Sequence, residues 1–161
     1  MDLTEETTAW HEAGHAMMAI LCGGFIERVT IEPPYDDGPA RYGDTVTRWS
    51  GMSARQLAAA EIRVNLAGPV IEMIFTGKRS DFESVEEWSA DWALAKVAAM
   101  SVSRNQQSAR KLLSSVAVEI HEIFAPANVW AAVSAVAEDL LAHKTLDHNQ
   151  VQYHVDFWTR R

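Results

Sequence analysis

The sequence has little of what disulfide-bonded, membrane-spanning or nucleic-acid-binding proteins require. Among its 161 residues Cys22 is the sole cysteine, so no internal disulfide can form, which suits a reducing compartment. The apolar stretch at residues 16–22 is too short to cross a bilayer, and the acidic first residues are unlike a signal peptide. Lys and Arg number 14 against 22 Asp and Glu, which disfavours nucleic-acid binding. We therefore expect a cytoplasmic protein with neither a membrane nor a nucleic-acid partner.

The composition indicates one folded domain. Apolar residues make up 48% and charged residues 22% of the chain, which is typical of globular rather than disordered proteins. A chain of this length can bury a sizeable core. No repeat or low-complexity linker divides it, so we expect a single domain over residues 1–161.

The first part of the chain changes from a helical to a strand pattern. Thr4 and the acids after it are typical of a helix start, and Gly23-Gly24 should end that helix after Cys22. Residues 26–32 alternate apolar and polar side chains and predict a strand. A turn region rich in Pro, Asp and Gly (residues 33–39) separates it from a second strand at residues 42–49, so the two form a small hairpin.

The remaining sequence is helical. Ser53 should cap a helix over residues 54–75, and Pro69 should kink or split this helix near Ala67-Gly68. An acidic, irregular stretch follows at residues 80–89. The further helices are expected from residue 90 or 91 through 100, and over residues 106–124, 127–142 and 146–157. The predicted fold is mainly α with one small β-hairpin next to the first helix.

The strongest functional signal is His11-Glu12-Ala13-Gly14-His15, an H-E-x-x-H motif. Residues four apart lie on one face of a helix, so His11 and His15 can bind one Zn²⁺ together. Glu12 follows the first histidine and is placed to act as the general base that activates a water. The motif predicts a zinc hydrolase with His11 and His15 as ligands and Glu12 as the catalytic residue.

The motif leaves the third ligand open, because a catalytic zinc usually has three protein ligands and one open position. Cys22 is more simply a buried small residue than a ligand. The other candidates are acids and histidines further along the chain, namely Glu61, Glu72, Asp81, Glu83, Asp91, His121, His143, His148 and His154. Trp88 and Trp92 stand on either side of Asp91 and either border the site or pack the core.

Several stretches, in order, resemble the peptidase domain of FtsH-type proteases, the M41 metallopeptidases. They cover nearly the whole chain: His11-Glu12-Ala13-Gly14-His15-Ala16, Arg28-Val29-Thr30-Ile31-Glu32-Pro33 with Gly43, Leu66-Ala67-Gly68 with Glu72 and Phe75-Thr76-Gly77, Ala90-Asp91-Trp92-Ala93-Leu94-Ala95, and residues 133–151. The first stretch is specific, whereas the others are weaker singly.

The resemblance implies Asp91 as the third zinc ligand, in preference to Asp81, because the family's aspartate begins an alanine-rich helix. It also implies that Glu72 orients a ligand histidine through the free ring N–H. Pro69 and Met73 depart from the family pattern at an arginine and a glutamate. The family's ATPase module is absent too, since no G-x-x-x-x-G-K-[ST] motif occurs in this sequence.

The expected function is therefore that of a zinc-dependent metalloendopeptidase acting on unfolded or short polypeptides. The strand at residues 26–32 would offer an edge on which an extended substrate pairs. The alternatives are a non-catalytic metal-binding regulatory or interaction module, and a hydrolase of a substrate other than a peptide. The resemblance also implies two further partners: other copies of the chain in a homo-oligomer, or a separate ATPase.

Overall fold

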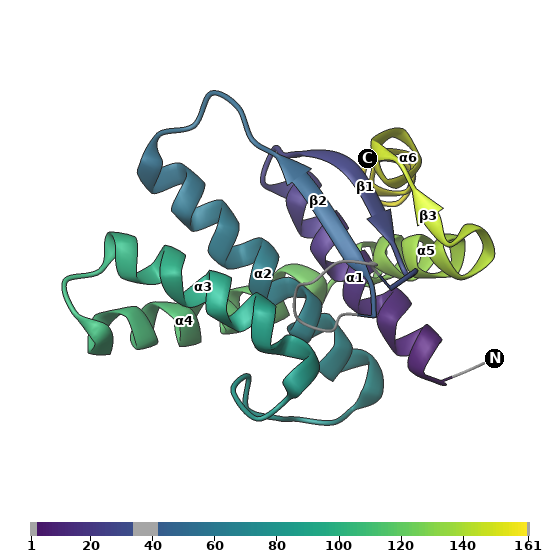
Figure 1. The fold of residues 1–161 in the computed structure, drawn as a ribbon. Coiled ribbons are helices and arrows are strands. Elements are labelled where there is room, and N and C mark those ends of the chain that lie inside the picture. Colours follow the sequence, from purple (N-terminus) through teal and green to yellow (C-terminus); the bar gives the residue numbers. More distant parts are fainter. Residues whose placement is uncertain (1–2, 34–41, 161) are drawn as a thin grey trace.

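The computed structural model describes residues 3–33 and 42–160, and these are mostly helical with a small antiparallel sheet. Figure 1 shows the arrangement. In chain order the elements are α1 (Leu3–Leu21), β1 (Phe25–Thr30), β2 (Asp44–Arg48), α2 (Ala54–Thr76), the 3₁₀ turn η1 (Glu86–Trp88), α3 (Ser89–Val102), α4 (Gln106–Phe124), α5 (Ala127–His143), β3 (Thr145–Leu146) and α6 (His148–Thr159). The expected mainly helical class with a β-hairpin is confirmed.

Helix α1 lies in the middle of the fold and is covered on several sides. It packs against α2, α5, α6 and the sheet (Figure 1). Every residue from position 8 to position 19 is buried, including the two histidines and Glu12 of the motif. Small side chains allow neighbours to approach α1 closely. A Cβ on Gly14 would lie 2.9 Å from the carbonyl oxygen of Ala67, so glycine permits the crossing of α1 and α2.

Helix α2 is continuous from Ala54 to Thr76, so Pro69, expected to kink or split it near Ala67-Gly68, does not split it. Pro69 lies inside the helix and is buried, and packing against the core offsets its missing backbone N–H. Both ends of α2 lie where the sequence predicts them: Ser53 forms a capping box with Gln56, and Gly77 ends the helix with φ +70°.

Most of the predicted core positions of α2 are buried, namely Ile62, Leu66, Val70 and Ile71. Leu57 and Ile74 are only partly buried.

The sheet has the order β2-β1-β3 and both pairings are antiparallel. The hairpin of β1 and β2 is confirmed, although all but the first residue of the turn expected at residues 33–39 lies outside the described residues. Strand β3 was not predicted, because two residues carry no periodic pattern. It pairs Leu146 with Val29, and α6 therefore begins at His148 rather than at Leu146.

The order of the strands contradicts the expectation that residues 26–32 form a free edge for an extended substrate. Strand β1 lies between β2 and β3, so residues 26–32 do not form an edge strand of the sheet. The backbone N–H of Ile26 also donates to His148 Nδ1 at 3.2 Å. Within the described residues, the outer edge on the other side belongs to β2. Any extended peptide that adds to this sheet beside α1 must therefore pair with β2.

The helices were also compared with the length and hydropathy of membrane spans. Within residues 3–33 and 42–160, no single helix meets both requirements. Helices α4 and α5 meet them only when taken together across their 93° bend.

Candidate metal centre

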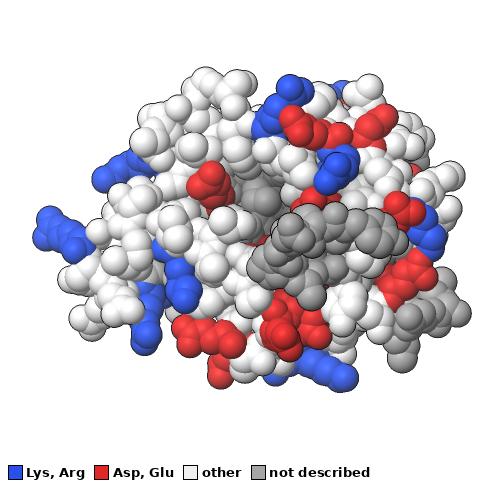
Figure 2. Space-filling view, viewed as in Figure 1, with Lys and Arg blue, Asp and Glu red and all other residues white. Residues whose placement is uncertain are grey.

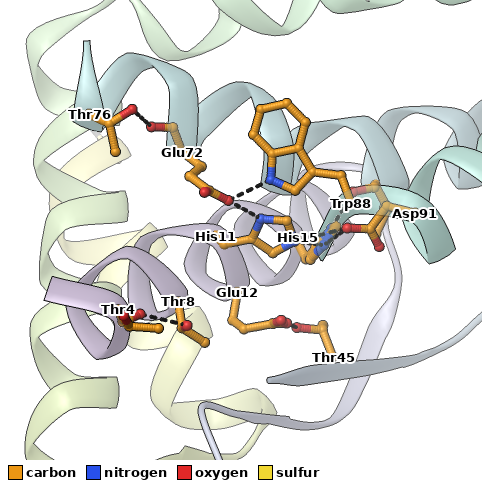
Figure 3. A network of polar contacts seen from close by, with 11 residues as sticks. Thr4, Thr8, His11, Glu12, His15, Thr45, Glu72, Thr76, Trp88 and Asp91 are labelled. Atoms are coloured by element: carbon orange, nitrogen blue, oxygen red, sulfur yellow. Dashed lines mark hydrogen bonds and ion pairs between the residues drawn. The ribbon is translucent and has the colours of Figure 1, made fainter. Parts of the chain in front are cut away.

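The H-E-x-x-H motif lies in the buried middle of α1, as the sequence predicts. His11 and His15 are one turn apart, and their imidazole rings meet edge to face with centroids 4.7 Å apart. The two Nε2 atoms lie 3.0 Å from each other. Figure 3 shows both rings turned toward the same point between α1, α2 and α3.

Gly68 on α2 makes room for this pair. A Cβ at that position would lie 2.4 Å from His15 Nε2 and 2.8 Å from His11 Nε2, well inside contact distance. Four positions before Gly68, one turn earlier on α2, the Val64 backbone carbonyl also faces the site and lies 2.6 Å from His15 Nδ1. A carbonyl only accepts, so Nδ1 of His15 donates to it. The Nε2 of a neutral His15 then carries a lone pair toward the site.

Glu72, also on α2, orients the ring of His11 as the Val64 carbonyl orients that of His15. His11 Nδ1 donates to Glu72 Oε2 at 2.8 Å, across 61 residues of sequence. This carboxylate therefore orients the ring of His11 from outside and leaves its Nε2 lone pair facing His15. The placement agrees with the orienting role expected for Glu72.

Asp91, in the first turn of α3, completes a triangle of atoms. Its Oδ2 lies 2.9 Å from His11 Nε2 and 3.1 Å from His15 Nε2. In the neutral state of both rings, three electron pairs would meet at one point with no hydrogen between them. Such an arrangement requires protons or a cation.

The donor set and its spacing fit a zinc ion. Two imidazole nitrogens and one carboxylate oxygen are a ligand set of catalytic zinc sites. Tetrahedral ligands at bond lengths of ~2.0–2.1 Å lie roughly 3.3 Å apart. The edges of the triangle measure 2.9, 3.0 and 3.1 Å, so a small outward movement admits the ion.

Glu12 is the other carboxylate near the histidines. Possible ligand atoms of His11, Glu12 and His15 all lie within 4.8 Å of one another. The oxygen of Asp91 is closer to both rings, and Glu12 Oε2 instead accepts a hydrogen bond from Thr45 Oγ1 at 2.6 Å. We take Asp91 as the better third ligand, which leaves Glu12 beside the metal position rather than within the triangle (Figure 3).

The charges of these groups depend on one another. Burial alone would lower the pKa of His11, but its hydrogen bonds with Asp91 and Glu72 outweigh this and raise that pKa to about 10. Burial also opposes protonation of His15, yet the charge of Asp91 raises the pKa of His15. Burial would raise the pKa of Asp91, but the two histidines bring it well below its ordinary value. Without metal, protons therefore hold the triangle together.

The site opens into a cavity of about 390 Å³. Its wall includes the ligand triangle, Glu12, residues at the start of β2 and, across from them, Leu94 of α3. Gly43 keeps the β2 side narrow, since a Cβ there would lie 2.7 Å from Glu12 Cγ. In the space-filling view of Figure 2, Asp and Glu lie around the middle and lower part of this face, with Lys and Arg scattered among them.

The other candidate ligands lie away from this cavity or do not face the triangle. Asp81 is exposed in the loop after Gly77, Glu83 is exposed in the same loop, and neither lines the cavity. His121 and His143 are exposed as well, whereas His148 and His154 are partly buried at the far side of the sheet and in α6. Cys22 is half-buried at the end of α1 and does not line the cavity.

Sequence reasoning did not single out Thr45, Val64 or the bond made by Trp88. Trp88 is buried, and its Nε1 donates to the same Glu72 oxygen that His11 uses, at 2.7 Å. Trp92 packs flat on Phe82, with ring centroids 5.3 Å apart. The residue types gave no signal, since a threonine on a strand and a backbone carbonyl in a helix are ordinary features.

No family model and no curated protein matches the chain.

Proposed function

We propose that the chain is a zinc-dependent endopeptidase that hydrolyses peptide bonds of unfolded or short polypeptides. The observation that carries this proposal is the convergence of His11 Nε2, His15 Nε2 and Asp91 Oδ2 at 2.9–3.1 Å, with Glu12 beside them on the wall of an open cavity. A purely structural metal site has four protein ligands and needs neither a base nor access for a substrate.

His11, His15 and Asp91 would hold the ion, while Glu72 and the Val64 carbonyl keep the two rings oriented. When bound, zinc polarises a substrate carbonyl and lowers the pKa of a water, which makes that water a nucleophile at neutral pH. The chain itself must then supply a group that accepts the water's proton and returns it to the leaving amine.

Glu12 is suited to that role. It is buried, and burial raises the pKa of its carboxyl although the two histidines oppose this. A raised pKa brings a carboxylate closer to the operating pH, where a base transfers protons most effectively. The hydrogen bond from Thr45 Oγ1 holds Glu12 Oε2 at 2.6 Å and limits the rotation of the carboxylate.

The outer edge of β2 is the place for the substrate backbone. Gly43, Asp44 and Thr45 line the cavity together with Glu12, and β2 is paired on one side only within the described residues. An extended peptide that adds to this edge uses main-chain hydrogen bonds, so its binding tolerates many sequences. A folded protein cannot present its backbone in this way, which restricts the substrate to unfolded or short chains.

The resemblance to M41 peptidases supports the same proposal, because its most specific stretch contains His11, Glu12 and His15 and another contains Asp91. The rival proposal is a metal-binding regulatory or interaction module without catalysis. The openness of the cavity and the position of Glu12 favour the enzyme, since neither is needed for metal binding alone.

Replacement of the proposed base tests the function. Glu12→Gln should retain one zinc per chain, measured by mass spectrometry of the native protein, and lose hydrolysis of unfolded casein by about 10²–10⁴-fold. The variant spares all three ligands and keeps the size of the side chain. Glu138→Gln, an exposed glutamate outside the cavity, is the matched control and should behave as wild type.

The outcomes separate the proposals. Wild-type turnover in Glu12→Gln would refute the mechanism. Zinc binding without peptide hydrolysis in the wild-type chain would favour the regulatory module or a different substrate. The absence of zinc binding would refute both.

A further inference from the structure

We propose that Trp88 is a positioning residue for the metal centre. Its indole N–H fixes Glu72 and at the same time anchors the start of α3, so that His11 and Asp91 reach the same point. The inference rests on the proposed metal site and adds to it a residue that touches neither the ion nor the substrate.

The contact geometry gives the first reason. Trp88 Nε1 donates to Glu72 Oε2 at 2.7 Å, and the same oxygen accepts from His11 Nδ1 at 2.8 Å (Figure 3). Two donors on one oxygen restrain the carboxylate far more than one does. Trp88 is only 3% exposed, so water has little access to replace the indole N–H if it is removed. The ring of His11 is thus held through Glu72 by Trp88.

The position of Trp88 in the chain gives the second reason. It is the last residue of η1, and α3 begins at the next residue. Asp91 lies in the first turn of α3, three residues beyond Trp88. The bond to Glu72 therefore ties the beginning of α3 to α2, directly before the turn that carries the third ligand. One hydrogen bond couples the orientation of His11 to the placement of Asp91.

Trp92, four residues further along in α3, provides a contrast. Its Nε1 is buried and has no hydrogen-bond partner among the residues that the structure describes, and its ring stacks on Phe82. Trp88 also lies near Phe82, with ring centroids 5.9 Å apart. Replacing either tryptophan by phenylalanine removes an N–H and part of a ring from the same aromatic group. Only the change at Trp88 removes a hydrogen bond to Glu72.

The test compares zinc affinity in Trp88→Phe and Trp92→Phe, measured by competition with a chromophoric chelator. Loss of the hydrogen-bond partner of a ligand, here Glu72, typically costs about 10–100-fold in metal affinity. Trp88 bonds Glu72 rather than the ligand itself, so we expect Trp88→Phe to weaken binding by about 10-fold, the lower end of that range. Trp92→Phe should bind as wild type does. The visible absorption of bound Co²⁺ should also change in Trp88→Phe alone, because it reports ligand geometry rather than stability.

A double-mutant cycle identifies the partner. In a Glu72→Ala background, Trp88→Phe should cause no further loss of zinc affinity, because its acceptor is gone. If Trp88→Phe does not fold, the hydrogen bond can be tested without a substitution at Trp88. In the proton NMR spectrum, Glu72→Gln should shift the indole N–H resonance of Trp88 more than that of Trp92, since it neutralises the acceptor.

Wild-type affinity and an unchanged Co²⁺ spectrum in Trp88→Phe would overturn this inference and leave the proposed metal site intact. An equal loss in Trp92→Phe would also overturn it, since general packing would then explain both. If the wild-type chain binds neither zinc nor cobalt, the metal site and the inference fall together.

Discussion

The cavity beside α1 and a second pocket at α5 and α6 both pair a histidine with a carboxylate. In the cavity, His11 bonds Glu72 at 2.8 Å, and in the second pocket His154 Nε2 bonds Asp139 Oδ2 at 2.5 Å. The second pocket is also lined by Asp147, whose carboxylate accepts the backbone N–H of Gln150 and caps α6. By residue type alone, both places are candidates for a cation.

The two pockets differ in the number of acceptor atoms that still face one another once each histidine has bonded its carboxylate. Around His11, the remaining ring nitrogen meets a second histidine and a third acceptor that comes from 80 residues away. The lining of the second pocket contains one histidine, whose Nε2 already bonds Asp139, and Asp147 already accepts from Gln150 three residues further on. What singles out the cavity as the candidate metal centre is thus the convergence of acceptors without donors, rather than a local collection of histidines and acids.

The largest effect should come from removing a histidine of the cavity. His11→Ala or His15→Ala should reduce bound zinc from one per chain toward none, because two ligands seldom hold a catalytic zinc. The stabilisation that zinc gives the folded state should disappear as well. Native mass spectrometry and thermal unfolding with and without zinc measure both. His154→Ala in the second pocket is the control, and zinc loss in that variant alone would contradict the placement of the metal in the cavity.

Removal of the third ligand should have the next largest effect. Asp91→Ala should weaken zinc binding by more than the ~10–100-fold typical of an outer hydrogen-bond partner, because a ligand itself is lost. Asp81→Ala should not weaken it, since Asp81 is exposed and outside the cavity. Titration of both variants with zinc against a competing chelator measures the difference. A loss in Asp81→Ala with none in Asp91→Ala would refute Asp91 as ligand.

The smallest expected effect is the pH dependence of stability in the metal-free protein, in which protons replace the metal. The pKa of His11 is raised from 6.5 to about 10, so its contribution to stability is complete below pH 6.5 and is lost as pH rises toward about 10. We expect the chelator-treated protein to lose stability across this range in urea unfolding. His11→Gln should show a smaller loss, because only His15, whose pKa Asp91 also raises, remains. Zinc requires deprotonated imidazoles, so the stability that zinc adds should instead grow with pH. A flat profile for the chelator-treated protein would contradict the assignment.

Local sequence signals predicted the elements that depend on a few neighbouring residues. The spacing of His11 and His15, the cap at Ser53 and the stop at Gly77 act within one or two turns, and all are found where expected. The continuity of α2 through Pro69 could not be predicted, because burial on both sides of the residue decides it. Strand β3 also depends on tertiary pairing with β1 rather than on its own two residues.

The residues of the candidate site also fall into those that the sequence predicted and those that only the folded structure reveals. The motif on α1 named three residues, whereas the residues alone left Asp91 among many candidates, since only folding brings it 2.9 Å from His11. The resemblance to M41 peptidases, rather than periodicity, singled it out. Thr45 and the bond from Trp88 to Glu72 carried no sequence signal, because their roles exist only through contacts across 33 and 16 residues of chain.

The most direct test of a metal centre in the cavity is the position of a bound ion. Crystals of the chain grown with zinc, measured near the zinc absorption edge, should show one anomalous peak ~2.0–2.2 Å from His11 Nε2, His15 Nε2 and an Asp91 oxygen. Wild-type zinc binding with the peak at His154 and Asp139, or no peak within the triangle at full zinc loading, would contradict the account.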